Sequence, residues 1–169
     1  MKDAVVKESR ITRRFSILNK NRRPALVTFI TANDPTPDVF QQILEGMPSA
    51  GADIIEIGVP FSDPMADGPA IQAASQRALK YGTKISDVLE SVKSFRDIEP
   101  DTPIVLMGYY NPIYHYGAQE FAQDAAAAGV DGVIVVDLPP EEAEELNVHL
   151  RANNLHMIFL AAPTSSDER

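Results

Sequence analysis

The chain alternates between short runs of β-branched residues and longer stretches with the apolar spacing of amphipathic helices. The apolar runs predict five strands, at residues 24–32, 52–59, 103–110, 130–137 and 155–162. Helical stretches lie between them, at residues 37–47, 70–82, 84–95, 117–129 and 141–154. The order of the elements is therefore strand, helix, strand, with two helices between the second and third strands.

Turn and capping residues mark the ends of these elements. Thr36 followed by Pro37 is a typical helix start, and Thr83 is the expected cap of the helix at 84–95. The stretches AGADII (50–55) and AGVDGV (128–133) are near copies, in which a glycine suits the left-handed end of a helix and a strand follows at once. The chain therefore repeats a strand–helix unit.

Strands that are apolar on both faces and separated by helices predict an α/β fold with a parallel sheet covered by helices. With right-handed crossovers, two architectures remain: a (β/α)8 TIM barrel and an open doubly wound sheet. No G-x-G-x-x-G motif follows the first strand, so a dinucleotide-binding sheet has no support. A barrel needs eight strands and the pattern predicts five, so the pattern alone does not choose between the two.

Residues 1–23 are basic, and Ile11, Phe15 and Leu18 recur at helical spacing. A targeting peptide or a nucleic-acid-binding arm would also be basic, but Asp3 and Glu8 are unusual in a transit peptide. We expect residues 1–23 to form an amphipathic helix and residues 24–169 to form a single domain.

Composition narrows the class of protein. The chain of 169 residues is 44% apolar and 23% charged, as in an ordinary globular domain, and it has no cysteine for a disulfide or a thiolate metal site. No apolar run approaches the roughly 20 residues that span a bilayer. Residues 24–169 carry seven basic and 22 acidic side chains, which disfavours nucleic acid as a partner. A cytoplasmic enzyme is the default expectation.

Glu56 interrupts the apolar run ADIIEIGV. Side chains alternate along a strand, so Glu56 shares one face with Ile54 and Gly58 while Ile55 and Ile57 share the other. The apolar face should contact helices, which points Glu56 toward the barrel interior or the sheet crevice. Burial there should raise its pKa toward the range of acid–base catalysis. A buried glutamate paired with an arginine, or hydrogen-bonded to a neighbouring strand, is the alternative.

The loop PFSDPMADGP (60–69) adds Asp63 and Asp67 at the same end of the second strand. The aspartates either form Asx-turns that stiffen the loop or face a substrate. One buried carboxylate and one loop carboxylate would suit general acid–base chemistry. Further polar residues that follow strands are Asp34, Tyr109, Asn111 and Asp137.

Asn111 and Asp137 are expected to hold strand ends or to cap helices. His115 is expected in the third loop, His149 in a helix and His156 at the start of a strand, and no two have the spacing of metal ligands. No metal site is therefore predicted.

Four segments resemble the family of tryptophan synthase α subunits, and the resemblance runs from about residue 10 to the last residue. The segments are FITANDP (29–35), ADIIEIGVPFSDPMADGPAIQ (52–72), MGYYNPIYHYG (107–117) and VDGVIVVDLPPEE (130–142). The resemblance implies a (β/α)8 barrel, of which this chain supplies an N-terminal helix (1–23) that closes the bottom and about five strand–helix units (24–169).

The resemblance also implies a lyase of tryptophan biosynthesis that cleaves indole-3-glycerol phosphate to indole and glyceraldehyde 3-phosphate without a metal or organic cofactor. It assigns Glu56 to proton transfer at the glycerol hydroxyl and indole C3, and Asp67 to the indole N–H. Phe29 and Tyr109 are expected to bind the substrate.

As a partner, the resemblance implies a pyridoxal-phosphate β subunit in an α2β2 complex. Pro60, Asp63 and Asn111 are expected at that contact, and Asp137 at the rim that couples the subunits.

The family's phosphate-binding loops follow strands seven and eight, and these strands are not among the predicted elements. We therefore expect the 169-residue chain alone to be inactive and to be part of a longer or split protein, because a five-stranded piece of a barrel leaves two unpaired edges. A catalytically incomplete fragment that only docks on the β subunit is the alternative. A metal-assisted epimerase or aldolase would need His or Lys at strand ends, where none occurs.

Overall fold

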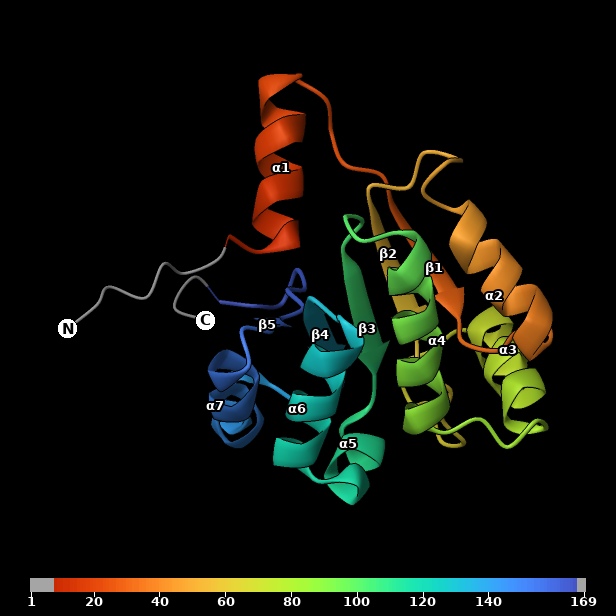
Figure 1. Cartoon of the computed structure of the whole chain (residues 1–169). Coiled ribbons are helices and arrows are strands. Elements are labelled where there is room, and N and C mark those ends of the chain that lie inside the picture. The colour runs from red at the N-terminus through yellow and green to blue at the C-terminus, as the bar shows by residue number, and fades with distance from the viewer. Residues whose placement is uncertain (1–7, 167–169) are drawn as a thin grey trace.

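The computed structural model describes residues 8–166, and a single parallel sheet organises them (Figure 1). Its strands are β1 (Val27–Thr31), β2 (Ile54–Gly58), β3 (Ile104–Gly108), β4 (Gly132–Val135) and β5 (His156–Ile158). All five predicted strands are present, each with shorter bounds than the apolar run suggested. They pair in the order β1-β2-β3-β4-β5. Each new strand adds on the same side, which is the winding of a barrel, whereas a doubly wound sheet reverses direction.

Helices connect the strands and cover the sheet. They are α1 (Arg10–Lys20), α2 (Pro37–Gly46), α3 (Pro69–Leu79), α4 (Ile85–Ile98), α5 (Tyr110–Tyr116), α6 (Ala118–Ala128) and α7 (Glu144–Ala152), with a 3-10 turn, η1 (Pro140–Glu142), before α7. Figure 1 shows α2, α4, α6 and α7 side by side along one face of the sheet, where neighbouring helices contact one another. Among the described residues no helix is long and apolar enough to cross a membrane.

The main core lies between this helical layer and the sheet. Ile55 and Ile57 of β2 are fully buried there, against Phe40, Phe95 and Phe121 of the helices. A smaller cluster on the opposite face contains Ile54, Val105 and Ile134. The alternation predicted for the second strand is therefore confirmed, and Glu56 lies on the inner face.

Helix α1 lies at the amino ends of the strands (Figure 1). An ion pair attaches its first residue there. Asp131, just before β4, is 5% exposed and pairs with Arg10 of α1 at 3.0 Å and with Arg96 of α4 at 2.8 Å. Its carboxylate also accepts a hydrogen bond from the Ile104 N–H at 2.9 Å. Arg96 is itself buried, which lowers its pKa to about 10, and it donates to the Gly129 carbonyl at 2.9 Å.

Asp53 occupies the equivalent position before β2. It pairs with Arg23 and Arg14 and accepts a hydrogen bond from the Leu26 N–H at 2.8 Å. Burial raises its pKa, but the bonds to Arg23 and Leu26 outweigh that effect and hold the pKa below its usual value. The two near-copy stretches thus each place a buried aspartate where arginines of the N-terminal segment reach it, a role that the sequence reasoning missed.

Two local expectations were wrong. Thr83 does not cap α4: its hydroxyl donates to the Ala78 carbonyl at 2.9 Å, and Lys84 is the N-cap, with the Asp87 carboxylate accepting from the Lys84 N–H at 2.8 Å. The third loop contains α5, so His115 is helical. The predicted amphipathic helix is present as α1, in which Leu18 is buried and Phe15 is 43% exposed.

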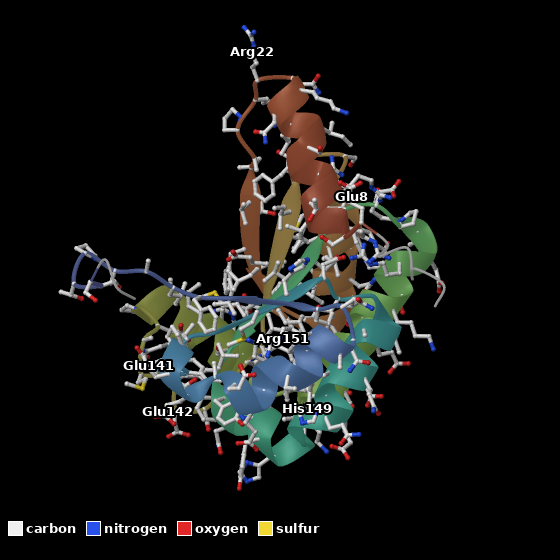
Figure 2. All side chains as sticks on the ribbon, turned by 90° about the vertical axis from the view of Figure 1, so that its left-hand side faces the viewer. Glu8, Arg22, Glu141, Glu142, His149 and Arg151 are labelled. Atoms are coloured by element: carbon white, nitrogen blue, oxygen red, sulfur yellow. The ribbon has the colours of Figure 1, made fainter. Side chains whose placement is uncertain are left out.

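The two ends of the sheet are distinct surfaces. Figure 2 shows Arg22, in the turn after α1, at the opposite end of the molecule from Glu141 and Glu142 of η1. His149 lies in a helix, α7, as predicted (Figure 2). The division of the chain at residue 23 stays a prediction, and residues 1–7 lie outside the described part.

Candidate functional site

A cavity of about 310 Å³ opens on the inner face of the sheet, toward the carboxyl ends of the strands. It is lined by residues of β1, β2, β3 and α3 and of the segments that follow the strands. They are Phe29, Thr31, Glu56, Gly58, Val59, Asp67, Ile71, Ser75, Met107, Gly108, Tyr109 and Val136. Most of this wall is apolar, and the sequence-predicted residues Glu56, Asp67, Phe29 and Tyr109 all belong to it.

Glu56 lies in the middle of β2 and is half-buried. No ion pair or hydrogen bond to its side chain occurs within residues 8–166, so the pairing alternative finds no partner in this part of the chain. Burial raises the pKa of Glu56. A carboxyl group whose ionised form is disfavoured by burial can act as a general acid or base.

Asp67 reaches the cavity from the loop between β2 and α3. The loop is held at this point: the Ala66 N–H donates to the Tyr109 hydroxyl at 2.9 Å, and the Gln72 side chain donates to the Asp67 carbonyl at 2.8 Å. The Phe61 ring lies 5.3 Å from the Tyr109 ring. Burial, together with the nearby Asp67 carboxylate, raises the pKa of Tyr109.

Phe29 lies on β1 directly opposite Glu56 in the strand register. Its ring extends over Gly58, so closely that a Cβ at position 58 would lie 2.5 Å from the ring carbon Cζ. The absence of a side chain at Gly58 therefore provides the space that the Phe29 ring occupies. The sequence reasoning did not assign this role to Gly58, because it depends on a contact between two strands.

The other predicted residues lie outside the cavity wall. Pro60 is buried, Asp63 is exposed beside Ser62, and Asn111 is exposed on α5. The Asp137 carboxylate accepts a hydrogen bond from the Tyr110 N–H at 2.8 Å and so joins the end of β4 to the start of α5. This agrees with the expectation that Asp137 holds a strand end.

Thr31 and Ser75 line the cavity and were not predicted. Thr31 has the same strand parity as Phe29, and Ser75 lies one helical turn after Ile71. The alternation of side chains along the first strand could have predicted that Thr31 lies on the same face as Phe29. Ser75 could not be placed without the position of α3.

The cavity combines titratable side chains with an apolar wall. Among the described residues, no group of three or more His, Cys, Asp or Glu side chains could hold a metal ion. The cavity offers two carboxylates and the hydroxyls of Tyr109, Thr31 and Ser75 beside an apolar surface.

Comparisons with known proteins agree with this fold. A profile of the family described as "Tryptophan synthase alpha chain" matches residues 15–169. The tryptophan synthase alpha chains of Gluconobacter oxydans and Nitrosococcus oceani are 56% and 55% identical to this chain over 161 residues. These matches cover 95% of this chain but only 60% and 59% of those proteins.

Solved structures give the same result. Tryptophan synthase subunit alpha from Legionella pneumophila is 45% identical, with a TM-score of 0.93 over 95% of this chain and 62% of that one. A tryptophan synthase from M. tuberculosis is 37% identical, with a TM-score of 0.90 over 96% and 65%. The described strands therefore correspond to part of the TIM barrel of these structures. The chain belongs to the tryptophan synthase alpha chain family.

Proposed function

We propose that this chain carries the proton-transfer residues of an indole-3-glycerol-phosphate lyase, which releases indole and glyceraldehyde 3-phosphate. The observation that carries the proposal is the position of Glu56 on the inner face of the sheet, in one cavity with Asp67. The Glu56 carboxyl group has no hydrogen-bond or ion-pair partner in residues 8–166. The family resemblance supplies the substrate, and the apolar wall of the cavity suits an indole ring.

The proposed reaction is a retro-aldol cleavage. Glu56 delivers a proton to indole C3 and removes the proton of the hydroxyl on the adjacent side-chain carbon. The bond between indole C3 and that carbon breaks, its electron pair returns to the ring, and the carbon leaves as an aldehyde. Asp67 accepts a hydrogen bond from the indole N–H and stabilises the positive charge of the protonated ring.

Two aromatic side chains orient the substrate in this proposal. Phe29 contacts the indole ring, and Tyr109 borders the same space while its hydroxyl holds the loop that carries Asp67. The raised pKa of Glu56 supports its role, because burial favours the protonated form that a general acid needs.

The phosphate group calls for residues beyond this chain. The family resemblance implies phosphate-binding loops after strands seven and eight, and the chain spans about 60% of the curated relatives it matches. Because binding energy from the remote phosphate supports the chemical step, the 169-residue chain alone is expected to give no measurable turnover.

Docking on a tryptophan synthase β subunit is the proposed partner interaction. Asp63 and Asn111 are exposed at the carboxyl end of the sheet, where the family resemblance implies the contact. Pro60 is buried, so in this proposal it shapes the loop and does not itself offer surface. A fragment that only docks would retain this binding and lack turnover.

The test is indole release from indole-3-glycerol phosphate, measured with and without a β subunit. The protein is a chimera that joins residues 1–169 to the C-terminal part of the Gluconobacter oxydans relative that this chain does not match. Glu56→Gln and Asp67→Asn should each reduce turnover by about 10²–10⁴-fold, whereas the control Glu90→Gln, on the exposed face of α4, should not. A chimera without turnover, or one that keeps its rate after Glu56→Gln, contradicts the proposal.

A further inference from the structure

Two hydroxyl groups in the cavity are not used by the proposed reaction. Thr31 ends β1 and Ser75 lies in the middle of α3, and both residues line the cavity. Each is only 4% exposed. They therefore lie among the most buried polar residues of the described chain.

Neither hydroxyl has a hydrogen-bond partner within residues 8–166. Other buried polar side chains do: Thr83 accepts from the Asn33 amide at 3.0 Å and donates to the Ala78 carbonyl at 2.9 Å. Burial of a hydroxyl without a partner is unfavourable, so two such groups in one cavity need an explanation.

Both hydroxyls remain accessible from the cavity. In the described part of the chain, every side-chain oxygen or nitrogen that is fully sealed from solvent has a hydrogen-bond partner. Because Thr31 and Ser75 have none, their hydroxyls are not sealed, and the cavity that they line is the space they face. A ligand in the cavity could reach them.

The two residues come from elements that contact each other, β1 and α3. On β1, Phe29 pairs with Glu56 and Thr31 pairs with Gly58, so Thr31 lies one inward position further toward the carboxyl ends. Helix α3 is attached to the segment after β1, because Arg77 donates to both Asp34 oxygens at 2.6 and 2.9 Å. The ion pair thereby holds α3, which carries Ser75, next to β1.

We infer that Thr31 and Ser75 form a subsite for the hydroxyl groups of a polyol chain attached to the aromatic ring of the substrate. This rests on the proposed function and adds the residues that select a hydroxylated side chain. The apolar wall takes the ring, Asp67 takes the ring N–H and Glu56 acts at the hydroxyl that becomes the aldehyde. The neighbouring hydroxyl then needs partners that both donate and accept, which Thr and Ser provide.

A subsite built on hydroxyl pairing discriminates strongly. A buried group that pairs with a substrate hydroxyl is left without a partner when an analogue lacks that hydroxyl. The cavity should therefore prefer a ring with a hydroxylated chain over the same ring with a plain alkyl chain.

The experiment measures binding of two phosphate-free ligands to the 169-residue chain by NMR titration. Indole-3-glycerol carries all three side-chain hydroxyls, and indole-3-propanol keeps only the terminal one. The variants are Thr31→Val and Ser75→Ala. Their matched controls are Thr28→Val, on the outer face of β1, and Ser91→Ala, on α4, both of which have protein hydrogen-bond acceptors.

Each cavity variant should weaken the binding of indole-3-glycerol by about three- to tenfold and leave the affinity for indole-3-propanol unchanged, as expected for the loss of one hydrogen bond. The controls should change neither affinity. Thermal unfolding of Thr31→Val should not occur at a lower temperature than in the wild type, because the hydroxyl has no partner in residues 8–166.

Three results would overturn the inference. In the first, the variants weaken the binding of both ligands equally or of neither. This result contradicts the subsite and leaves the proposed lyase function unaffected. In the second, Thr31→Val lowers the unfolding temperature, which makes the hydroxyl structural. In the third, the wild type binds neither ligand, which removes the proposed function and the subsite with it.

Discussion

Glu56 shows at the scale of one residue how position sets chemistry. A strand interior is the environment in which an ionised carboxylate is disfavoured, and no arginine in residues 8–166 compensates it. Its pKa is raised by burial for that reason. The residue is therefore destabilising at neutral pH, as expected of a group kept for a function.

The raised pKa predicts how stability depends on pH. The folded state binds the Glu56 proton more tightly than the unfolded chain does, so the wild type loses stability as pH rises from the ordinary glutamate pKa through the raised value. Glu56→Gln cannot ionise and should be more stable than the wild type at neutral pH, with the difference disappearing at acid pH. Urea unfolding across this pH range measures it, and a variant that is less stable at neutral pH would contradict the assignment.

The buried aspartates at the amino end should differ in importance. Asp131→Asn leaves the buried Arg96 without its counter-ion and should lower the free energy of unfolding by about 3–5 kcal/mol. Asp53→Asn leaves only Arg14 and Arg23, which water can reach, and should lower it by about 1–3 kcal/mol.

Urea unfolding at neutral pH measures both losses, with the exposed Asp97→Asn as a control that should change less than about 0.5 kcal/mol. The pKa of Asp53 is lowered, so its contribution is present above its usual pKa and is lost as pH falls through the lowered value. A larger loss from Asp53→Asn than from Asp131→Asn would show that burial of the arginine is not the deciding factor.

At the scale of elements, the contact between β1 and β2 forms the floor of the cavity. Gly58→Ala would bring a Cβ to 2.5 Å from the end of the Phe29 ring. The ring is 37% exposed and can turn away, so the fold should survive while indole binding falls. Binding of indole followed by NMR measures this effect.

Gly46→Ala is the matched control, because nothing lies within 4 Å of a Cβ at that position and the glycine ends α2. It should leave indole binding unchanged and stabilise the helix by about 0.5–1 kcal/mol. Undiminished indole binding by Gly58→Ala would mean that the Phe29 ring does not define the ring site.

At the scale of the whole molecule, β1 and β5 are the edges of the described sheet, and each pairs with one neighbour. Large apolar side chains are exposed along these edges: Leu26 (49%), Val27 (45%), Phe159 (42%) and Leu160 (59%). Unpaired apolar edges are sites at which further strands add.

This predicts complementation in trans. A separate chain that carries the unmatched C-terminal part of the Gluconobacter oxydans relative should bind residues 1–169 and restore indole release, which neither chain gives alone. Co-purification and an indole assay measure it. Leu160→Lys, at the exposed end next to β5, should weaken the association, whereas Tyr81→Lys, exposed after α3, should not. Turnover by the 169-residue chain alone would contradict the need for the phosphate loops.

Much of the fold could be predicted from the sequence because hydrophobic period and turn chemistry are local properties. The alternation in 52–59 determined which face of β2 carries Glu56, and Thr36 with Pro37 determined where α2 begins. The cap of α4 was mispredicted, because the competing local hydrogen bonds of Thr83 and Asp87 are not visible in the pattern. The α5 helix was not predicted either.

By itself, then, the sequence determined the parallel α/β fold and the inward position of Glu56, and its resemblance to a known family predicted that Glu56 and Asp67 act together. Only the tertiary structure brought Thr31 and Ser75 to one cavity, set the Phe29 ring over Gly58, and joined Asp53 and Asp131 to arginines of the N-terminal segment. The physical reason is distance along the chain: strand parity and helix period act over a few residues, whereas these contacts join elements that meet only when the sheet is assembled.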